Sequence, residues 1–283
     1  HTHTHTHTHM HTHTHTHTHI NIYIYIYICI HTCVCGSSFL SLRNESKKPR
    51  TNMKFLSTSQ MATFAAKGCL RFDGLIDEEI NQKFMGLFDQ KIGSNDRYAN
   101  SVIPNCRPGE LLKNAFPGDH PLSLVLDEPT VAGAIKSLMG EDPIFDHHHV
   151  HVTFPRSGSA QTNHQDSTID ARQLNFDVQM FYFPHEVTED MGGTRYIPGT
   201  HLRSVHESAI ARYQNIRGQM RVVCPAGTII FFHHGLWHGG GKNTGDVHRI
   251  MYKVRMQPSG SQALQWDTSC LLYTSPSPRD QRG

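Results

Sequence analysis

The sequence has little excess charge, few cysteines in its middle part and no long hydrophobic run. Its 283 residues carry a formal net charge of +2, which gives no general reason to expect nucleic acid as a partner. The run from residue 20 to residue 30 is too short and too rich in tyrosine to cross a bilayer, so no membrane partner is expected.

Cysteine is too scarce to define the fold. Between residues 61 and 269 only Cys69, Cys106 and Cys224 occur, too few and too scattered for a disulfide framework or a CxxC zinc site. We therefore expect a reducing compartment, cytoplasmic by default.

Both ends of the chain read as foreign to a folded domain. Residues 1–35 repeat His-Thr, then Ile-Tyr, then Cys-Val-Cys, and each repeat is the translation of an alternating dinucleotide. Eleven of the 24 histidines lie there, so a histidine-rich metal chelator is one alternative, although a translated microsatellite explains all three repeats. Residues 270–283 resemble a translated library adapter. We predict that 1–60 are non-native and disordered and that 270–283 are a non-native tail. A peroxisomal location stays open, because the natural C-terminus is then missing.

Residues 61–269 are predicted to form one domain. Helices are expected at 78–90 and at 129–139, the second ending at Gly140. The apolar period then changes to two, which predicts short strands at 149–154, 176–183, 195–197, 220–223, 228–232 and 248–256, besides an early one at 69–72. This order favours a mainly β fold with helical cover, a β-sandwich or jelly roll preceded by N-terminal helices.

The segment His164-Gln165-Asp166 is the first candidate for chemistry. A His-x-Asp pair with a distant histidine can hold one metal on two imidazoles and one carboxylate. That donor set leaves one face of an octahedral ion open, which suits non-haem Fe(II) and O2. By itself such a pair is weak evidence, because chance produces it in a histidine-rich chain.

A second segment strengthens this hypothesis. Residues 231–244 run from a strand into a glycine-rich turn that contains His238, and a returning strand begins near Arg249. If the two strands pair as an antiparallel hairpin, His238 and Arg249 lie close together. The arginine then offers a rigid fork of donors for a carboxylate. His233 and His234 are rival distal ligands, but neither is followed by a matching asparagine and arginine.

Four segments together resemble one enzyme family. They are GCLRFDGLIDEE at 68–79, HQD at 164–166, GGTRYIPGTH at 192–201 and HGGGKNTGDVHR at 238–249. In this order, over nearly all of 62–257, the chain resembles the phytanoyl-CoA dioxygenase family of Fe(II)/2-oxoglutarate-dependent oxygenases. The resemblance implies a double-stranded β-helix, which is a cupin-like jelly roll. It also implies Fe(II) as cofactor, with 2-oxoglutarate and O2 as co-substrates.

The resemblance also implies roles for particular residues. The implied metal ligands, which form the catalytic centre, are His164, Asp166 and His238. The implied 2-oxoglutarate contacts are Arg249 for the distal carboxylate, with Gln165 and Phe181 lining the co-substrate.

Several other positions concern the substrate. His149 and His151 share one face of a predicted strand, and Gln179 shares a face with Phe181, so all three are candidates for substrate contact. Two positions depart from the family pattern: Asn163 stands where many members have tryptophan, and Gly240 where a hydroxyl residue is usual. These departures affect the substrate and the fine contacts of 2-oxoglutarate.

The function expected from the sequence is therefore an Fe(II)/2-oxoglutarate-dependent dioxygenase. It is expected to hydroxylate a small-molecule or acyl substrate with release of succinate and CO2. Asp166 favours hydroxylation over halogenation, because halogenating relatives need a small residue there to free a site for halide. The alternative is a non-catalytic, cupin-like protein that binds a metal or ligand. The sequence does not indicate an oligomeric state.

Overall fold

The computed structural model describes residues 53–89, 100–156, 159–166, 176–203, 205–262 and 264–268. All of them lie in one compact unit, which spans Lys48–Gly283. The repeat tract at 1–35 and the tail at 270–283, together with the alternative of a histidine-rich chelator, lie outside the described residues. None of the helices in these ranges is long and apolar enough to span a membrane.

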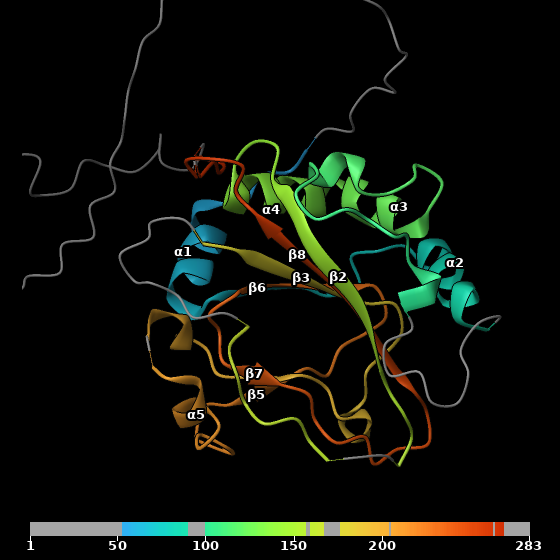
Figure 1. Ribbon diagram of the computed structural model, residues 1–283, viewed down its shortest axis with the longest axis vertical. Helices are drawn as coiled ribbons and strands as arrows, with labels where there is room; N and C mark the ends of the chain where they lie inside the picture. Colours follow the sequence, from blue (N-terminus) through green and yellow to red (C-terminus); the bar gives the residue numbers. More distant parts are fainter. Residues whose placement is uncertain are drawn as a thin grey trace, which may run out of the picture. The chain divides into compact units, whose positions relative to one another are not determined.

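The larger of two antiparallel sheets has five strands in the order β1-β6-β3-β8-β2. Figure 1 shows β6, β3, β8 and β2 of this sheet next to one another. In that order the strands are Cys69–Phe72, Thr228–His233, Val178–Phe183, Arg249–Gln257 and Ile144–Thr153. Side chains alternate along the central strand β3: Met180 and Tyr182 point to one face, and Phe181 and Phe183 to the other. Each face of the sheet therefore contributes to a different apolar core.

Helices cover one face of this sheet. They are α1 (Thr58–Lys67), α2 (Glu78–Asp89), α3 (Pro121–Asp127) and α4 (Pro129–Met139). Their buried apolar residues form one core with the inward residues of β2, β3, β6 and β8. Helix α4 matches its predicted limits, because Pro129 suits the first turn and Gly140 closes the last one. Figure 1 shows α3 and α4 on the opposite side of the large sheet from β5 and β7.

The smaller sheet faces the other side and has the order β5-β4-β7. Its strands are β5 (Met220–Arg221), β4 (Arg195–Tyr196) and β7 (His238–Gly239). A second apolar core lies between the sheets, with Phe181 and Phe232 from the large one and Tyr196 from the small one. The connections hold the short helix α5 (Glu207–Ile210) and four 3-10 turns, η1 (Asn100–Val102), η2 (Leu112–Asn114), η3 (Glu189–Met191) and η4 (Thr200–Leu202).

Two antiparallel sheets with helical cover confirm the predicted mainly β jelly roll. The expected limit at residue 61 is wrong, because the folded part described here begins before it. Ser57 and Gln60 form a capping box at the start of α1. Leu56 is 1% exposed, and its backbone N–H donates to Ser137 Oγ at 3.0 Å. Residues 53–60 therefore pack with the domain.

Candidate metal centre

Three metal-binding side chains converge in the fold. The ligand atoms of His164, Asp166 and His238 all lie within 4.8 Å of one another, and the described ranges hold no other such group of three histidine, cysteine or acidic residues. Asp166 Oδ1 lies 3.3 Å from His164 Nε2 and 3.7 Å from His238 Nε2. The two motifs chosen from the sequence thus meet at one point.

The backbone orients the two imidazoles. His238 lies on β7, and His164 joins it through an isolated β-bridge with N–H···O distances of 2.8 and 2.9 Å. Each imidazole donates through Nδ1 to a carbonyl: His164 to that of Thr162 at 3.0 Å, and His238 to that of Leu236 at 2.8 Å. A neutral ring that donates through Nδ1 has the lone pair of its Nε2 atom free for a metal.

The protonation of the three groups suits a cation. Burial alone raises the pKa of Asp166, but the hydrogen bond from His164, the charge that His238 carries at low pH and the charge of Lys253 outweigh it. They hold the pKa of Asp166 well below its usual range. Burial lowers the pKa of His238 to about 4, so this ring is neutral at pH 7. Burial also lowers the pKa of His164, but the hydrogen bond to Asp166 leaves that pKa raised overall, so a metal must displace this proton. Two imidazoles and an ionised carboxylate fit Fe(II) and leave an open face.

A buried arginine shares a cavity with the three ligands. The cavity has a volume of about 60 Å³, and Arg249 and Phe181 line it together with His164, Asp166 and His238. Arg249 is 4% exposed, and its Nε atom has no hydrogen-bond partner. Burial lowers its pKa to about 10, and no acidic side chain of the described part opposes that shift. A buried guanidinium without an acidic partner is a place for an anion.

Two of the other donors of Arg249 are held by the protein. Nη1 donates to the Gly192 carbonyl at 2.9 Å, and Nη2 donates to Thr153 Oγ1 at 2.7 Å. These two bonds fix the plane of the guanidinium and leave Nε available.

The middle of the chain matches the model of the family described as phytanoyl-CoA dioxygenase (PhyH), over residues 111–251. The match includes all three ligand residues and Arg249. The chain belongs to the phytanoyl-CoA dioxygenase family. This confirms the resemblance seen in the sequence, and Fe(II), 2-oxoglutarate and O2 are the cofactor and co-substrates of that family of oxygenases.

Solved structures agree with this family fold. SnoK, a non-heme alpha ketoglutarate dependent carbocyclase from nogalamycin biosynthesis, has a TM-score of 0.56 at 19% identity, over 78% of this chain and 92% of its own. HygX from Streptomyces hygroscopicus, solved with iron bound, has a TM-score of 0.54 at 14% identity, over 75% and 97%. EvdO2 from Micromonospora carbonacea var. aurantiaca, complexed with 2-oxoglutarate, has a TM-score of 0.51 at 16% identity, over 76% and 96%. At such identities the likeness shows the fold. No curated protein matches the sequence significantly.

The predicted hairpin between His238 and Arg249 is wrong. Strand β7 pairs with β4 in the small sheet, whereas β8 pairs with β2 and β3 in the large one. Residues 240–248 cross from one sheet to the other, and the buried Asn243 fixes this crossing through bonds to the carbonyls of Thr153 and Val247. In this family member, the metal ligands and the arginine therefore come from opposite walls of the same cavity.

The other predicted contacts divide into two groups. Phe181 and His151 line the cavity at the triad. Gln165 is buried but does not line the cavity. His149 does not line it either, although its ring lies on the same face of β2 as that of His151, with the ring centroids 6.0 Å apart. Gln179 is fully buried and does not line it either, and neither of its side-chain polar atoms has a hydrogen-bond partner. Their roles toward co-substrate and substrate stay predictions.

Sequence reasoning missed one charged residue of this cavity. Lys253 is 9% exposed, and its Nζ lies 3.0 Å from Asp166 Oδ2. The sequence held a signal for this residue: side chains alternate along a strand, so Arg249, Met251 and Lys253 lie on the same face of β8. That face looks into the cavity, because all three residues line it.

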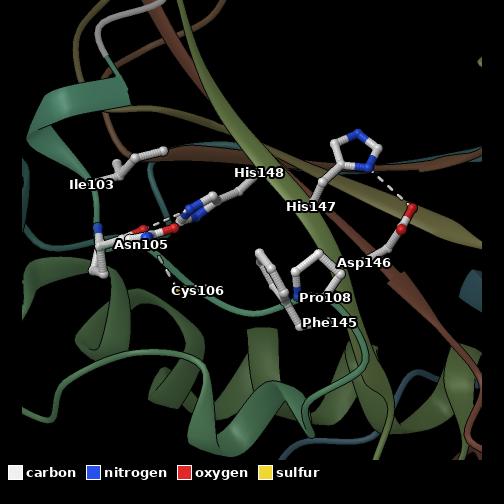
Figure 2. A pocket seen from close by; sticks show the side chains of 9 residues that line it. Ile103, Asn105, Cys106, Pro108, Phe145, Asp146, His147 and His148 are labelled. Carbon is white, nitrogen blue, oxygen red and sulfur yellow. Dashed lines mark hydrogen bonds and ion pairs between the residues drawn. The ribbon is translucent and has the colours of Figure 1, made fainter.

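A larger cavity, of about 340 Å³, lies beside the edge strand β2 (Figure 2). None of the three ligand residues lines it. On one side of the strand His148 bonds to the Tyr252 hydroxyl at 3.0 Å and to the Pro104 carbonyl at 2.9 Å, and on the other His147 bonds to Asp146 (Figure 2). The imidazoles at this edge are thus used in internal hydrogen bonds, and the metal-binding geometry belongs to the smaller cavity.

Proposed function

We propose that this member of the phytanoyl-CoA dioxygenase family hydroxylates a small-molecule or acyl substrate and releases succinate and CO2. The observation that carries the proposal is the shared cavity of the metal ligands and Arg249, a buried cation with no acidic partner among the described residues. A 2-oxoglutarate molecule has a keto acid for a metal at one end and a carboxylate for a guanidinium at the other. Its two ends therefore match the two features of the cavity.

Each residue has one task in this proposal. His164, Asp166 and His238 hold Fe(II), and Arg249, which lines the same cavity and whose Nε has no partner in the described part of the chain, binds the distal carboxylate of 2-oxoglutarate. Phe181, which is 1% exposed, packs beside His238 with ring centroids 6.0 Å apart and keeps water out of this wall. The bound iron supplies the oxidative decarboxylation of 2-oxoglutarate by O2 and the oxidation of a substrate C–H bond.

Two further observations support the proposed kind of substrate and the proposed reaction. HygX was solved with nickel, 2-oxoglutarate and hygromycin B bound, so a neighbour of this fold takes a small molecule. Asp166 supplies a carboxylate to the metal-binding group, whereas halogenating relatives need a small residue there, which favours hydroxylation over halogenation. Because SnoK is a carbocyclase, ring formation is the outcome to compare with hydroxylation in product analysis.

The test uses the full chain loaded with Fe(II) and 2-oxoglutarate without O2. Admission of O2 is expected to produce succinate from 2-oxoglutarate, slowly alone and faster with a substrate found by screening small molecules and acyl compounds. His164→Ala is expected to abolish succinate formation, because it removes one of three metal ligands. His206→Ala is the matched control, since His206 is exposed and bonds only locally to Ser208. Undiminished turnover in His164→Ala contradicts the proposal.

The alternative function is a non-catalytic protein that keeps the metal and the fold. It predicts metal binding without affinity for 2-oxoglutarate, and it predicts no effect of Arg249→Ala on any ligand. The buried, unneutralised guanidinium in the metal cavity favours the oxygenase, because metal binding alone does not require it.

A further inference from the structure

The two carboxylate oxygens of Asp166 face different partners. Oδ1 faces both imidazoles, at 3.3 Å from His164 Nε2 and 3.7 Å from His238 Nε2. Oδ2 accepts a hydrogen bond from Lys253 Nζ at 3.0 Å. One oxygen is thus directed at the metal position, and the other is already occupied by an ammonium group.

The lysine is held firmly enough to impose this arrangement. Lys253 lies in the middle of β8, where it pairs with His149 of β2 on one side and with Phe181 of β3 on the other. Its side chain is 11% exposed and that of Asp166 is 14% exposed, so water competes little for the bond. Asp166 lies two residues after His164, which bridges to His238 of the small sheet, whereas Lys253 lies on the large sheet. The contact therefore also joins the two walls of the cavity.

Stability does not account for a lysine at this position. Desolvation of a buried ion pair offsets most of its Coulombic attraction, and apolar residues at such sites are often equally stabilising. Its neighbour on the same face, Met251, is buried and apolar. The three metal donors are also complete without the lysine. The ammonium group therefore calls for a role connected with Asp166.

We propose that Lys253 is a positioning residue that holds Asp166 Oδ2 and restricts this ligand to coordination through Oδ1. The inference rests on the metal centre of the proposed function. A carboxylate bound through both oxygens takes two positions on an octahedral metal, so four protein donors leave too few positions for a keto acid and O2 together. With Oδ2 occupied, the protein supplies three donors and three positions stay open.

The test replaces the ammonium and reads the coordination of the metal directly. Co(II) is added to the full chain without 2-oxoglutarate, because its visible ligand-field absorption changes with coordination number and geometry. Lys253→Met is expected to bind Co(II) with an altered absorption spectrum, and Lys253→Arg, which keeps a cationic donor, is expected to retain the native one. In the Fe(II) protein, Lys253→Met is expected to lower the rate of succinate formation by about 10- to 100-fold, as loss of a partner to a metal ligand commonly does.

The control is Lys83→Met, which removes a lysine of an exposed ion pair with Glu79 and is expected to leave the spectrum unchanged. If Lys253→Met does not fold, as judged by circular dichroism, Lys253→Gln replaces it, because its shorter side chain ends before Oδ2. A native Co(II) spectrum in the folded variant overturns the role of Lys253 and leaves the proposed function standing. Wild-type protein that binds Co(II) but not 2-oxoglutarate overturns the proposed function, and the spectra of the variants still decide the inference. Wild-type protein that binds no Co(II) overturns both.

Discussion

Replacement of Arg249 by methionine is expected to separate co-substrate affinity from stability. Arg249 is 4% exposed and has no acidic partner among the described residues, so its burial is unfavourable in the free protein. The drop of its pKa from 12.5 to about 10 corresponds to roughly 3 kcal/mol of unfavourable desolvation. Methionine removes this cost but also removes two hydrogen bonds, to Gly192 and Thr153, each worth about 1.5 to 3 kcal/mol. The lost bonds outweigh the regained desolvation by a few kcal/mol at most, so we expect the free energy of unfolding to fall by no more than about 3 kcal/mol.

The affinity for 2-oxoglutarate is expected to change much more. Removing one partner of a buried ion pair costs about 3 to 5 kcal/mol, which is at least about a hundredfold in the dissociation constant. The comparison ligand is 2-oxovalerate, which keeps the keto acid but has a methyl group in place of the distal carboxylate. Its affinity is expected to stay the same or to rise in Arg249→Met, because the new side chain is apolar.

The assay is calorimetric titration of both keto acids into the Ni(II)-loaded full chain, native and Arg249→Met, with urea unfolding of both proteins. Nickel avoids turnover during the titration. The reasoning is refuted if Arg249→Met binds 2-oxoglutarate within threefold of the native protein. Equal weakening of both keto acids also refutes it, because the loss then does not come from the distal carboxylate.

Two further predictions concern the packing of the sheets and the buried histidines. Gly193→Ala is expected to lower the free energy of unfolding by about 3 kcal/mol, the upper end of the usual cost of overpacking, because a Cβ there meets the Val222 carbonyl oxygen at 1.8 Å. Gly240→Ala, where the nearest atom is 3.6 Å away, is the matched control and is expected to cost less than about 0.5 kcal/mol; similar urea midpoints for the two variants contradict this. Burial lowers the pKa of His151 and of His233 to about 3, so both stay neutral in the fold while the unfolded chain takes up protons below about pH 6.5. Stability is therefore unaffected above pH 7 and decreases as the pH falls, by about 2 kcal/mol per histidine at pH 5. Urea unfolding at pH 7.5 and pH 5 measures this loss, and a loss as large in His233→Leu as in the native protein counts against His233 as a source.

Local patterns predicted most of the elements and both metal-binding motifs. The period of two predicted β3, β6 and β8 to within a few residues, and proline and glycine at its ends predicted the limits of α4. The start of α1 was missed because its capping box, Ser57 with Gln60, lies in a polar stretch next to low-complexity sequence. A local signal was present there, but the surrounding composition concealed it.

The partners of each strand depend on contacts that are distant in sequence. A glycine-rich segment between two strands looks like a hairpin turn, and only the pairing of His238 with Tyr196 shows that the chain changes sheets there. The contact of Lys253 with Asp166 was out of reach for the same reason, because it needs the register of β8 and the distance between the sheets. The types of ligand residue could be predicted from the sequence, whereas the group that orients one of them could not.

The division of the site between two sheets has a consequence for folding. The metal ligand His238 lies on the small sheet, and Arg249 and Lys253 lie on the large one. A metal and a keto acid bound together then act as a non-covalent cross-link between the two layers, in addition to the apolar core that joins them. With metal and keto acid bound, the two sheets should therefore separate in a single unfolding step. A variant that loosens the packing between the sheets should release the co-substrate before it loses its secondary structure.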